Sequence, residues 1–63
     1  LNQLDDAIVV AREAIQLDPA FADAHRILGV CLRAKGNEAD ARAALQRAAD
    51  LGDEIARQLL EQK

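Results

Sequence analysis

With 63 residues the chain can form one small domain at most, and a chain of this length buries only about 60% of the surface that its unfolded form exposes. Fourteen alanines, a single proline and the lack of Trp, Tyr and Met favour helices over strands, so the composition predicts an all-α fold. The formal net charge of −3 is mixed in sign along the chain, which argues against nucleic acid as a partner, because proteins that bind phosphate backbones carry a clustered basic surface.

Cys31 is the only cysteine, so the chain cannot form an internal disulfide, and no Cys/His spacing typical of a metal site is present. This pattern favours a reducing compartment, and we expect a cytoplasmic location. No apolar run approaches the roughly 18 residues that a membrane span needs, so we expect no membrane partner and no cofactor. The abundance of Ala and the preference for Arg over Lys suggest a GC-rich bacterial genome.

The first predicted helix covers residues 4–17. Its apolar residues recur at the three-and-four spacing of one helix face, which contains Leu4, Ala7, Ile8, Ala11, Ala14 and Ile15. Val10 and Leu17 lie beside this face and widen it, so we expect the helix to contact more than one neighbour. Asp18-Pro19 ends the helix, because a residue that precedes proline is disfavoured in helical geometry.

Two further predicted helices are separated by Gly36, which can take the left-handed conformation that closes a helix. The segment from Ala22 to Lys35 has one stripe at helical spacing, made of Ala24, Ile27, Leu28, Cys31 and Lys35. In the segment from Glu38 to Leu51 small residues dominate the inner face, which contains Ala41, Ala44, Leu45, Ala48 and Leu51. Such small side chains allow neighbouring helices to approach closely.

Gly52 ends the third helix as Gly36 ends the second, and Asp53 can then cap a last helix that reaches about Gln62. A shift of 34 residues brings two parts of the chain into register, pairing Asp6 with Asp40, Ala7 with Ala41, Ala14 with Ala48 and Leu17 with Leu51. A 34-residue period of paired helices is the signature of tetratricopeptide repeats. Leu28-Gly29, Gly36 and the small residues of the following helix fit that pattern, so the chain resembles the tetratricopeptide repeat family.

The resemblance implies one domain over residues 1–63, built of about four helices in antiparallel helix-turn-helix repeats, as a fragment of an α-α superhelix or solenoid. Residues 4–17 would be the second helix of a partial repeat, 22–51 a complete repeat and 53–62 a C-terminal capping helix. The sequence departs from the family pattern at His25, Leu32 and Ala11, where the family often has large aromatic residues. It also has Asp53 where the second repeat would have its proline.

In repeat arrays the first helices of successive repeats line a concave binding surface. The resemblance therefore implies a protein-protein interaction scaffold, not an enzyme, which presents a concave helical groove to a peptide or partner protein. The helical wheel places four residues on a stripe separate from the inner face: Asp23, Arg26, Val30 and Arg33. Arg26 and Arg33 would offer guanidiniums to a peptide carboxylate or carbonyl, although a solvated helix face has the same pattern. Val30 stands where the carboxylate clamp of some family members needs Asn, so that clamp is not expected.

Two alternatives remain open at this point. One is a structural or self-association module, because helix 4–17 lacks a repeat partner and leaves an apolar flank that a second copy could cover in a homo-oligomer. The other is a targeting arm of a larger, enzymatic protein.

The sequence also predicts the surroundings of His25, Cys31 and Phe21. Cys31 and His25 are six positions apart, which is a rotation of roughly 240° on a helix, so they point to different faces and predict no catalytic pair. We expect Cys31 to be a small buried apolar residue and His25 to pack between the helices of its own repeat. Phe21 is expected to fill the gap between consecutive repeats, and the acidic residues are expected at helix starts and on outward faces.

Overall fold

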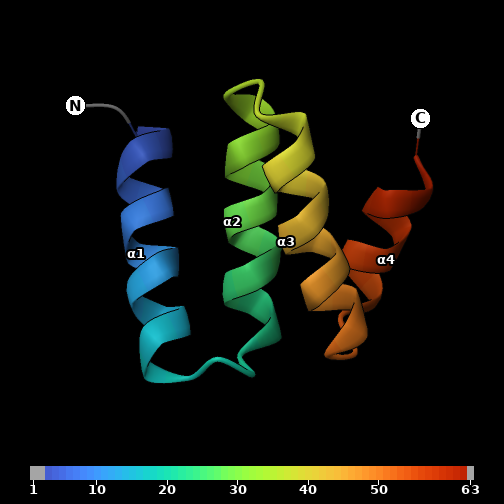
Figure 1. The fold of residues 1–63 in the computed structure, drawn as a ribbon, viewed down its shortest axis with the longest axis horizontal. Helices are drawn as coiled ribbons and strands as arrows, with labels where there is room; N and C mark the ends of the chain where they lie inside the picture. Colours follow the sequence, from blue (N-terminus) through green and yellow to red (C-terminus); the bar gives the residue numbers. More distant parts are fainter. Residues whose placement is uncertain (1–2, 63) are drawn as a thin grey trace.

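The computed structural model describes residues 3–62, and within this range the chain forms four α-helices and no strand. The helices are α1 (Gln3–Leu17), α2 (Ala22–Ala34), α3 (Glu38–Asp50) and α4 (Glu54–Glu61). Figure 1 shows them side by side in chain order, each running opposite to the one before it. The all-α fold of about four helices that the sequence predicts is therefore confirmed.

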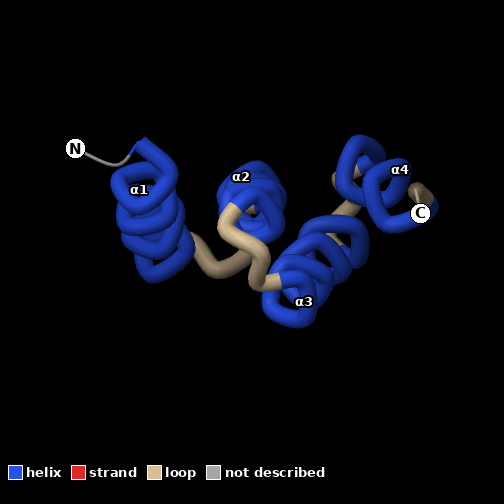
Figure 2. The backbone as a smooth tube through the Cα atoms, turned by 90° about the horizontal axis from the view of Figure 1, so that it is seen from above, coloured by secondary structure: helices blue, strands red, loops and turns tan. Residues whose placement is uncertain are grey.

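Each helix packs mainly on its neighbours in the sequence: α2 contacts both α1 and α3, and α3 contacts α4. Seen from above, α2 and α4 lie on the same side of α3 (Figure 2). The α2/α3 contact is the closest of these, because Gly29 of α2 lies directly on α3. A Cβ at Gly29 would stand 2.7 Å from Cγ of Leu45 and 3.0 Å from the carbonyl oxygen of Ala41. The small residues of α3 and this glycine are what allow the two helices to approach.

The two glycines expected to end helices do so by the same geometry. Gly36 has a φ of +86°, a conformation that glycine adopts without steric penalty. Its N–H donates to the carbonyl of Arg33, and the N–H of Asn37 donates to that of Leu32, which is the hydrogen-bond pattern of a Schellman motif. Gly52, with a φ of +100°, closes α3 with the equivalent pair of bonds.

The N-terminal helix is attached to the rest of the molecule at both of its ends. At its C-terminal end Asp18 accepts a hydrogen bond from the N–H of Ala20 through Oδ1, at 3.1 Å, and so forms a tight turn after the helix. At the opposite end, Asp5 forms an ion pair with Lys35, which follows the last residue of α2. The turn and the ion pair thus lie at opposite ends of the contact between α1 and α2.

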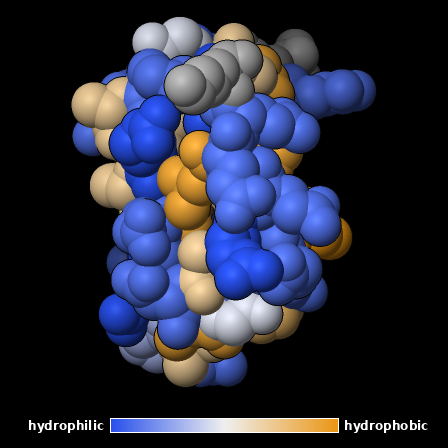
Figure 3. All heavy atoms as spheres, turned by 90° about the vertical axis from the view of Figure 1, so that its right-hand side faces the viewer, coloured by the Kyte–Doolittle hydropathy of each residue, from blue (hydrophilic) through white to orange (hydrophobic). Residues whose placement is uncertain are grey.

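The two ends of the helix row differ in how much apolar surface they leave uncovered. In α1 Ala11 is the only buried residue among those described, and Val10 is 63% exposed. The α4 end, shown in Figure 3, is mostly hydrophilic, with a narrow hydrophobic strip between hydrophilic ridges. The uncovered apolar surface therefore lies mainly on the α1 side.

Two expectations about apolar residues are wrong for this same region. Phe21 does not fill a gap, since it is 44% exposed, and Ile27, which the pattern places on the inner stripe of α2, is 41% exposed. Both line an open apolar cleft of about 370 Å³ between α1 and α2, together with Val10. Both residues are apolar in the sequence, but the sequence does not say whether a neighbouring helix covers them.

Candidate interaction surface

The helical wheel predicts a stripe of four residues on α2: Asp23, Arg26, Val30 and Arg33. Their spacing of three, four and three residues places them on one face of the helix. Asp23 and Val30 are exposed, whereas Arg26 and Arg33 are half-buried. We call this set the α2 stripe.

Arg26 is held by two carboxylates. Its Nε donates to Oδ2 of Asp53 at 2.9 Å, and its terminal nitrogen lies 3.5 Å from Oδ1 of Asp23, one helical turn away. The Asp53 side chain is only 7% exposed and that of Arg26 is 25% exposed, so this ion pair is largely screened from water. The hydrogen bond to Asp53 is the main reason why the pKa of Arg26 is raised above its usual value.

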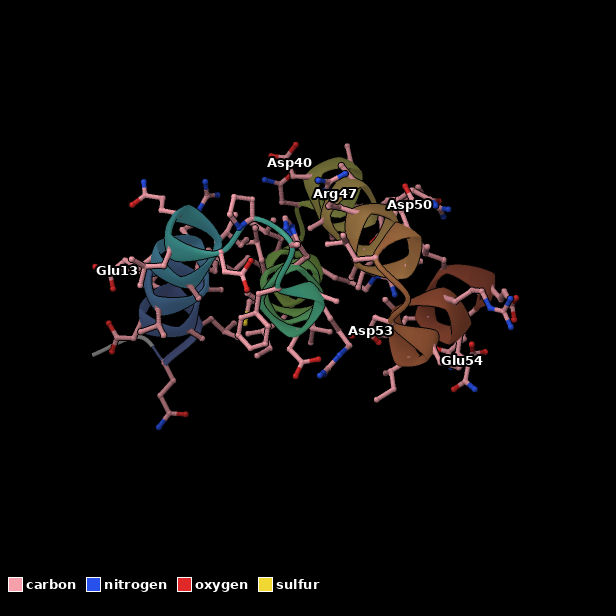
Figure 4. The ribbon with its side chains drawn as sticks, turned by 90° about the horizontal axis from the view of Figure 1, so that it is seen from below. Glu13, Asp40, Arg47, Asp50, Asp53 and Glu54 are labelled. Carbon is pink, nitrogen blue, oxygen red and sulfur yellow. The ribbon has the colours of Figure 1, made fainter. Side chains whose placement is uncertain are left out.

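Asp53 has a second structural function, because it caps α4. Its Oδ1 accepts a hydrogen bond from the N–H of Ala56 at 3.0 Å, in the N-cap position that the sequence predicts. This backbone bond, followed by the hydrogen bond and charge of Arg26, lowers the pKa of Asp53 below its ordinary value, although burial opposes the shift. Figure 4 shows Asp53 between α3 and α4, with Glu54 beside it directed outward. At the position where the family often has proline, this chain therefore carries a capping carboxylate that joins α4 to α2.

Only some of the hydrogen-bond donors of the Arg33 guanidinium are paired. One terminal nitrogen lies 3.2 Å from Oε2 of Glu38, at the start of α3. Its Nε is buried, and none of the described residues accepts a hydrogen bond from it. Arg33 borders a cleft of about 350 Å³, which also involves Glu38, Arg42 and Gln62. We call this the Arg33/Arg42 cleft.

Arg42 is the residue of this cleft that the sequence reasoning missed. It belongs to α3, and helical periodicity relates residues within one helix only, so the stripe argument on α2 could not reach it. The turn at Gly36 reverses the chain and brings the start of α3 beside the end of α2. A basic residue shortly after the turn is the only sequence signal that could have pointed to it.

A third hollow, of about 550 Å³, lies where α1, α2 and α3 meet. Its lining includes His25 and Leu32, two positions at which the family often has larger aromatic residues. His25 is half-buried and its Nε2 donates to the carbonyl oxygen of Pro19 at 2.9 Å. Cys31 is buried, as expected, and no hydrogen bond between it and His25 occurs in the described part of the chain.

Between residues 3 and 62, no group of His, Cys, Asp and Glu side chains has the arrangement of a metal site. None of the four helices is sufficiently long and apolar to cross a membrane. Among the acidic residues, Figure 4 shows Glu13 of α1 and Asp50 of α3 pointing away from the packed helices, in agreement with solvated positions.

The fold and the close packing at Gly29 define a helical repeat protein. The family model described as tetratricopeptide repeat matches residues 1–62, so the chain belongs to the tetratricopeptide repeat family. Comparisons with curated proteins and with solved structures gave no match. Members of this family generally act as scaffolds for protein-protein interaction and are typically not catalytic.

Proposed function

We propose that this chain is a non-catalytic scaffold that binds a peptide or a partner protein along the α2 stripe, which forms part of a concave groove. The observation that carries the proposal is Val30, an apolar side chain that is 44% exposed between two arginines. Both arginines are held by carboxylates of the same chain, Arg26 by Asp53 and Arg33 by Glu38. An apolar contact flanked by positioned charges is a surface that can bind a peptide with little loss of side-chain entropy.

Helix α4 lies beside the α2 stripe. Because α2 and α4 lie on the same side of α3, a segment bound on the α2 stripe would face α4 as well (Figure 2). First helices of successive repeats line the binding surface in repeat arrays. In this interpretation residues 22–51 are the complete repeat, 4–17 is the second helix of a partial repeat, and 53–62 is the cap.

The groove can be tested with Val30→Glu and the control Val9→Glu. Val9 is also exposed, at 56%, but it lies on α1. Peptides would be selected from a random phage-displayed library on the wild-type chain, and their affinities measured for both variants. We expect Val30→Glu to weaken the selected peptides at least tenfold and Val9→Glu to leave them unchanged.

Equal affinity for wild type and Val30→Glu would contradict the groove assignment, as would a library that yields no enriched peptide. Arg26 is unsuitable for this test, because its replacement would also break the ion pair with Asp53. Circular dichroism of both variants confirms that the helices are intact before affinities are compared.

Self-association is a second candidate, and one comparison within the chain favours it. Under the 34-residue shift, four buried residues of α3 correspond to four residues of α1 that line the apolar cleft: Ala41, Ala44, Leu45 and Ala48 correspond to Ala7, Val10, Ala11 and Ala14. In α3 these positions are buried in a helix that packs on both α2 and α4. In α1 the corresponding residues line an open cleft, and Val10 is 63% exposed. A second copy that covers this flank would give a homo-oligomer.

Sedimentation equilibrium over a wide concentration range tests this candidate. We expect a concentration-dependent oligomer that Val10→Asp dissociates, whereas Val9→Asp, at a similarly exposed position outside the cleft, leaves it intact. A wild-type chain that remains monomeric at millimolar concentration would eliminate self-association. No observation in the described residues favours the targeting-arm alternative.

A further inference from the structure

We propose that the Arg33/Arg42 cleft binds a carboxylate group of the partner peptide. This inference rests on the proposed function and names the chemistry that the α2 stripe recognises at its C-terminal end. The cleft lies where the end of α2, the start of α3 and the end of α4 meet, and it has a volume of about 350 Å³.

Arg33 carries a buried hydrogen-bond donor that no described residue pairs with. Buried polar groups in proteins nearly always have a hydrogen-bond partner, and a buried donor without one is energetically unfavourable. The Nε of Arg33 is such a donor, since Glu38 is bonded to a terminal nitrogen of the same guanidinium and not to Nε. The side chain as a whole is 30% exposed and borders the cleft, so an oxygen in the cleft can reach the guanidinium that carries this donor.

The cleft contains a second guanidinium, that of Arg42. Arg42 lines the same cleft and forms no ion pair or hydrogen bond with any described residue. Arg26, which the sequence suggested as the partner cation of Arg33, is already bonded to Asp53 and Asp23. The structure therefore assigns the second cation to Arg42 of α3. Guanidinium groups bind carboxylates through paired, charge-assisted hydrogen bonds.

The charge of the cleft selects among anions. Arg33 and Arg42 contribute two positive charges and Glu38 one negative charge, which leaves a formal charge of +1. This charge matches a singly charged carboxylate, whereas a phosphate monoester carries between 1.5 and 2 negative charges at neutral pH, roughly. The amide of Gln62 adds a neutral donor to the lining.

The experiment uses acetate as the probe and the Nε–H resonances of the arginines in ¹⁵N-labelled protein as the readout. Acetate is titrated against sodium chloride at equal ionic strength. We expect a saturable shift of the Arg33 and Arg42 resonances in acetate only. In Arg42→Gln the acetate affinity reported by Arg33 should fall about tenfold. The matched control is Arg57→Gln, because Arg57 is an exposed arginine of α4 that does not line the cleft, and it should leave the titration unchanged.

Identical shifts in acetate and chloride, or an Arg33 response that Arg42→Gln does not weaken, would overturn the proposal. Selected peptides then distinguish the two sources of carboxylate: loss of affinity on Glu→Gln or Asp→Asn replacement identifies a side chain, and loss on C-terminal amidation identifies the peptide terminus. If Val30→Glu abolishes peptide binding while Arg42→Gln changes neither peptide nor acetate binding, the groove stands and the carboxylate site is wrong. If Val30→Glu has no effect, the groove itself is wrong.

Discussion

Replacing Asp53 with alanine should destabilise the protein more than the replacement of any other charged side chain in residues 3–62. The substitution removes two interactions at once, the N-cap hydrogen bond to Ala56 and the ion pair with Arg26. Both connect α4 to the rest of the molecule, since one starts the helix and the other bonds its first turn to α2. After the substitution Arg26 retains only Asp23, at 3.5 Å.

The size of the effect follows from these two interactions. Loss of an N-cap side chain costs about 1 kcal/mol, and loss of a hydrogen bond between charged groups costs roughly 2 kcal/mol where the pair is largely buried. The free energy of unfolding should therefore fall by about 3 kcal/mol for Asp53→Ala. A domain of this length has a total stability of roughly 3–9 kcal/mol, and each kcal/mol corresponds to about 4–8 °C in Tm. We expect Tm to fall by more than about 10 °C.

Thermal and urea unfolding followed by circular dichroism measure this loss. Asp53→Asn separates the two contributions, because Asn caps a helix about as well as Asp but carries no charge. Its loss should be about 2 kcal/mol, the share of the ion pair. Asp50→Ala is the control: Asp50 is an exposed aspartate at the end of α3, bonded only to Gln46 among the described residues, and its removal should change stability by less than about 0.5 kcal/mol.

The reasoning would be refuted by an Asp53→Ala protein that unfolds within about 0.5 kcal/mol of wild type, since neither interaction would then stabilise the fold. Equal losses for Asp53→Asn and Asp53→Ala would refute the assignment of a separate cap. Hydrogen exchange of the α4 amides locates the effect, because these amides should lose protection first in both variants.

Gly29→Ala should lower the free energy of unfolding by about 1–2 kcal/mol, because the added Cβ would overlap Leu45. The gain in helix propensity, roughly 1 kcal/mol, does not offset this overlap. Urea unfolding measures the sign of the change. Gly36→Ala should lower Tm, because a φ of +86° costs about 1 kcal/mol for alanine. The new Cβ itself meets no atom within 4 Å, so the cost comes from the backbone alone. An unchanged Tm would show that the turn can rearrange. The lowered pKa of Asp53 stabilises the fold above the ordinary aspartate pKa of about 3.9, and this contribution disappears as the pH falls through the lower folded-state value. Wild type should therefore lose more stability than Asp53→Asn when unfolding is measured from pH 5 to pH 2.

Much of the fold could be predicted because its signals are local. Helix periodicity depends on residues three and four apart, and the glycines that end α2 and α3 act through bonds within their own turns. The cap at Asp53 is equally local, since its oxygen bonds an amide three residues away. Of the candidate site, the sequence could predict only the residues that share one helix. The α2 stripe is a property of α2 alone, but Asp53 and Glu38, which pair with its arginines, lie beyond the helix.

The sequence by itself determined the all-α class, the helix terminators and the repeat family, because backbone hydrogen bonding and side-chain periodicity operate over a few residues. Only the tertiary structure decided which charged side chains are already paired within the chain. It bonds Arg26 to Asp53 across 27 positions of the chain, and it brings Arg42 of α3 to the cleft that Arg33 borders. It also showed that Phe21 and Val10 are exposed, because burial depends on whether a neighbouring helix is present and not on the apolar character of the residue.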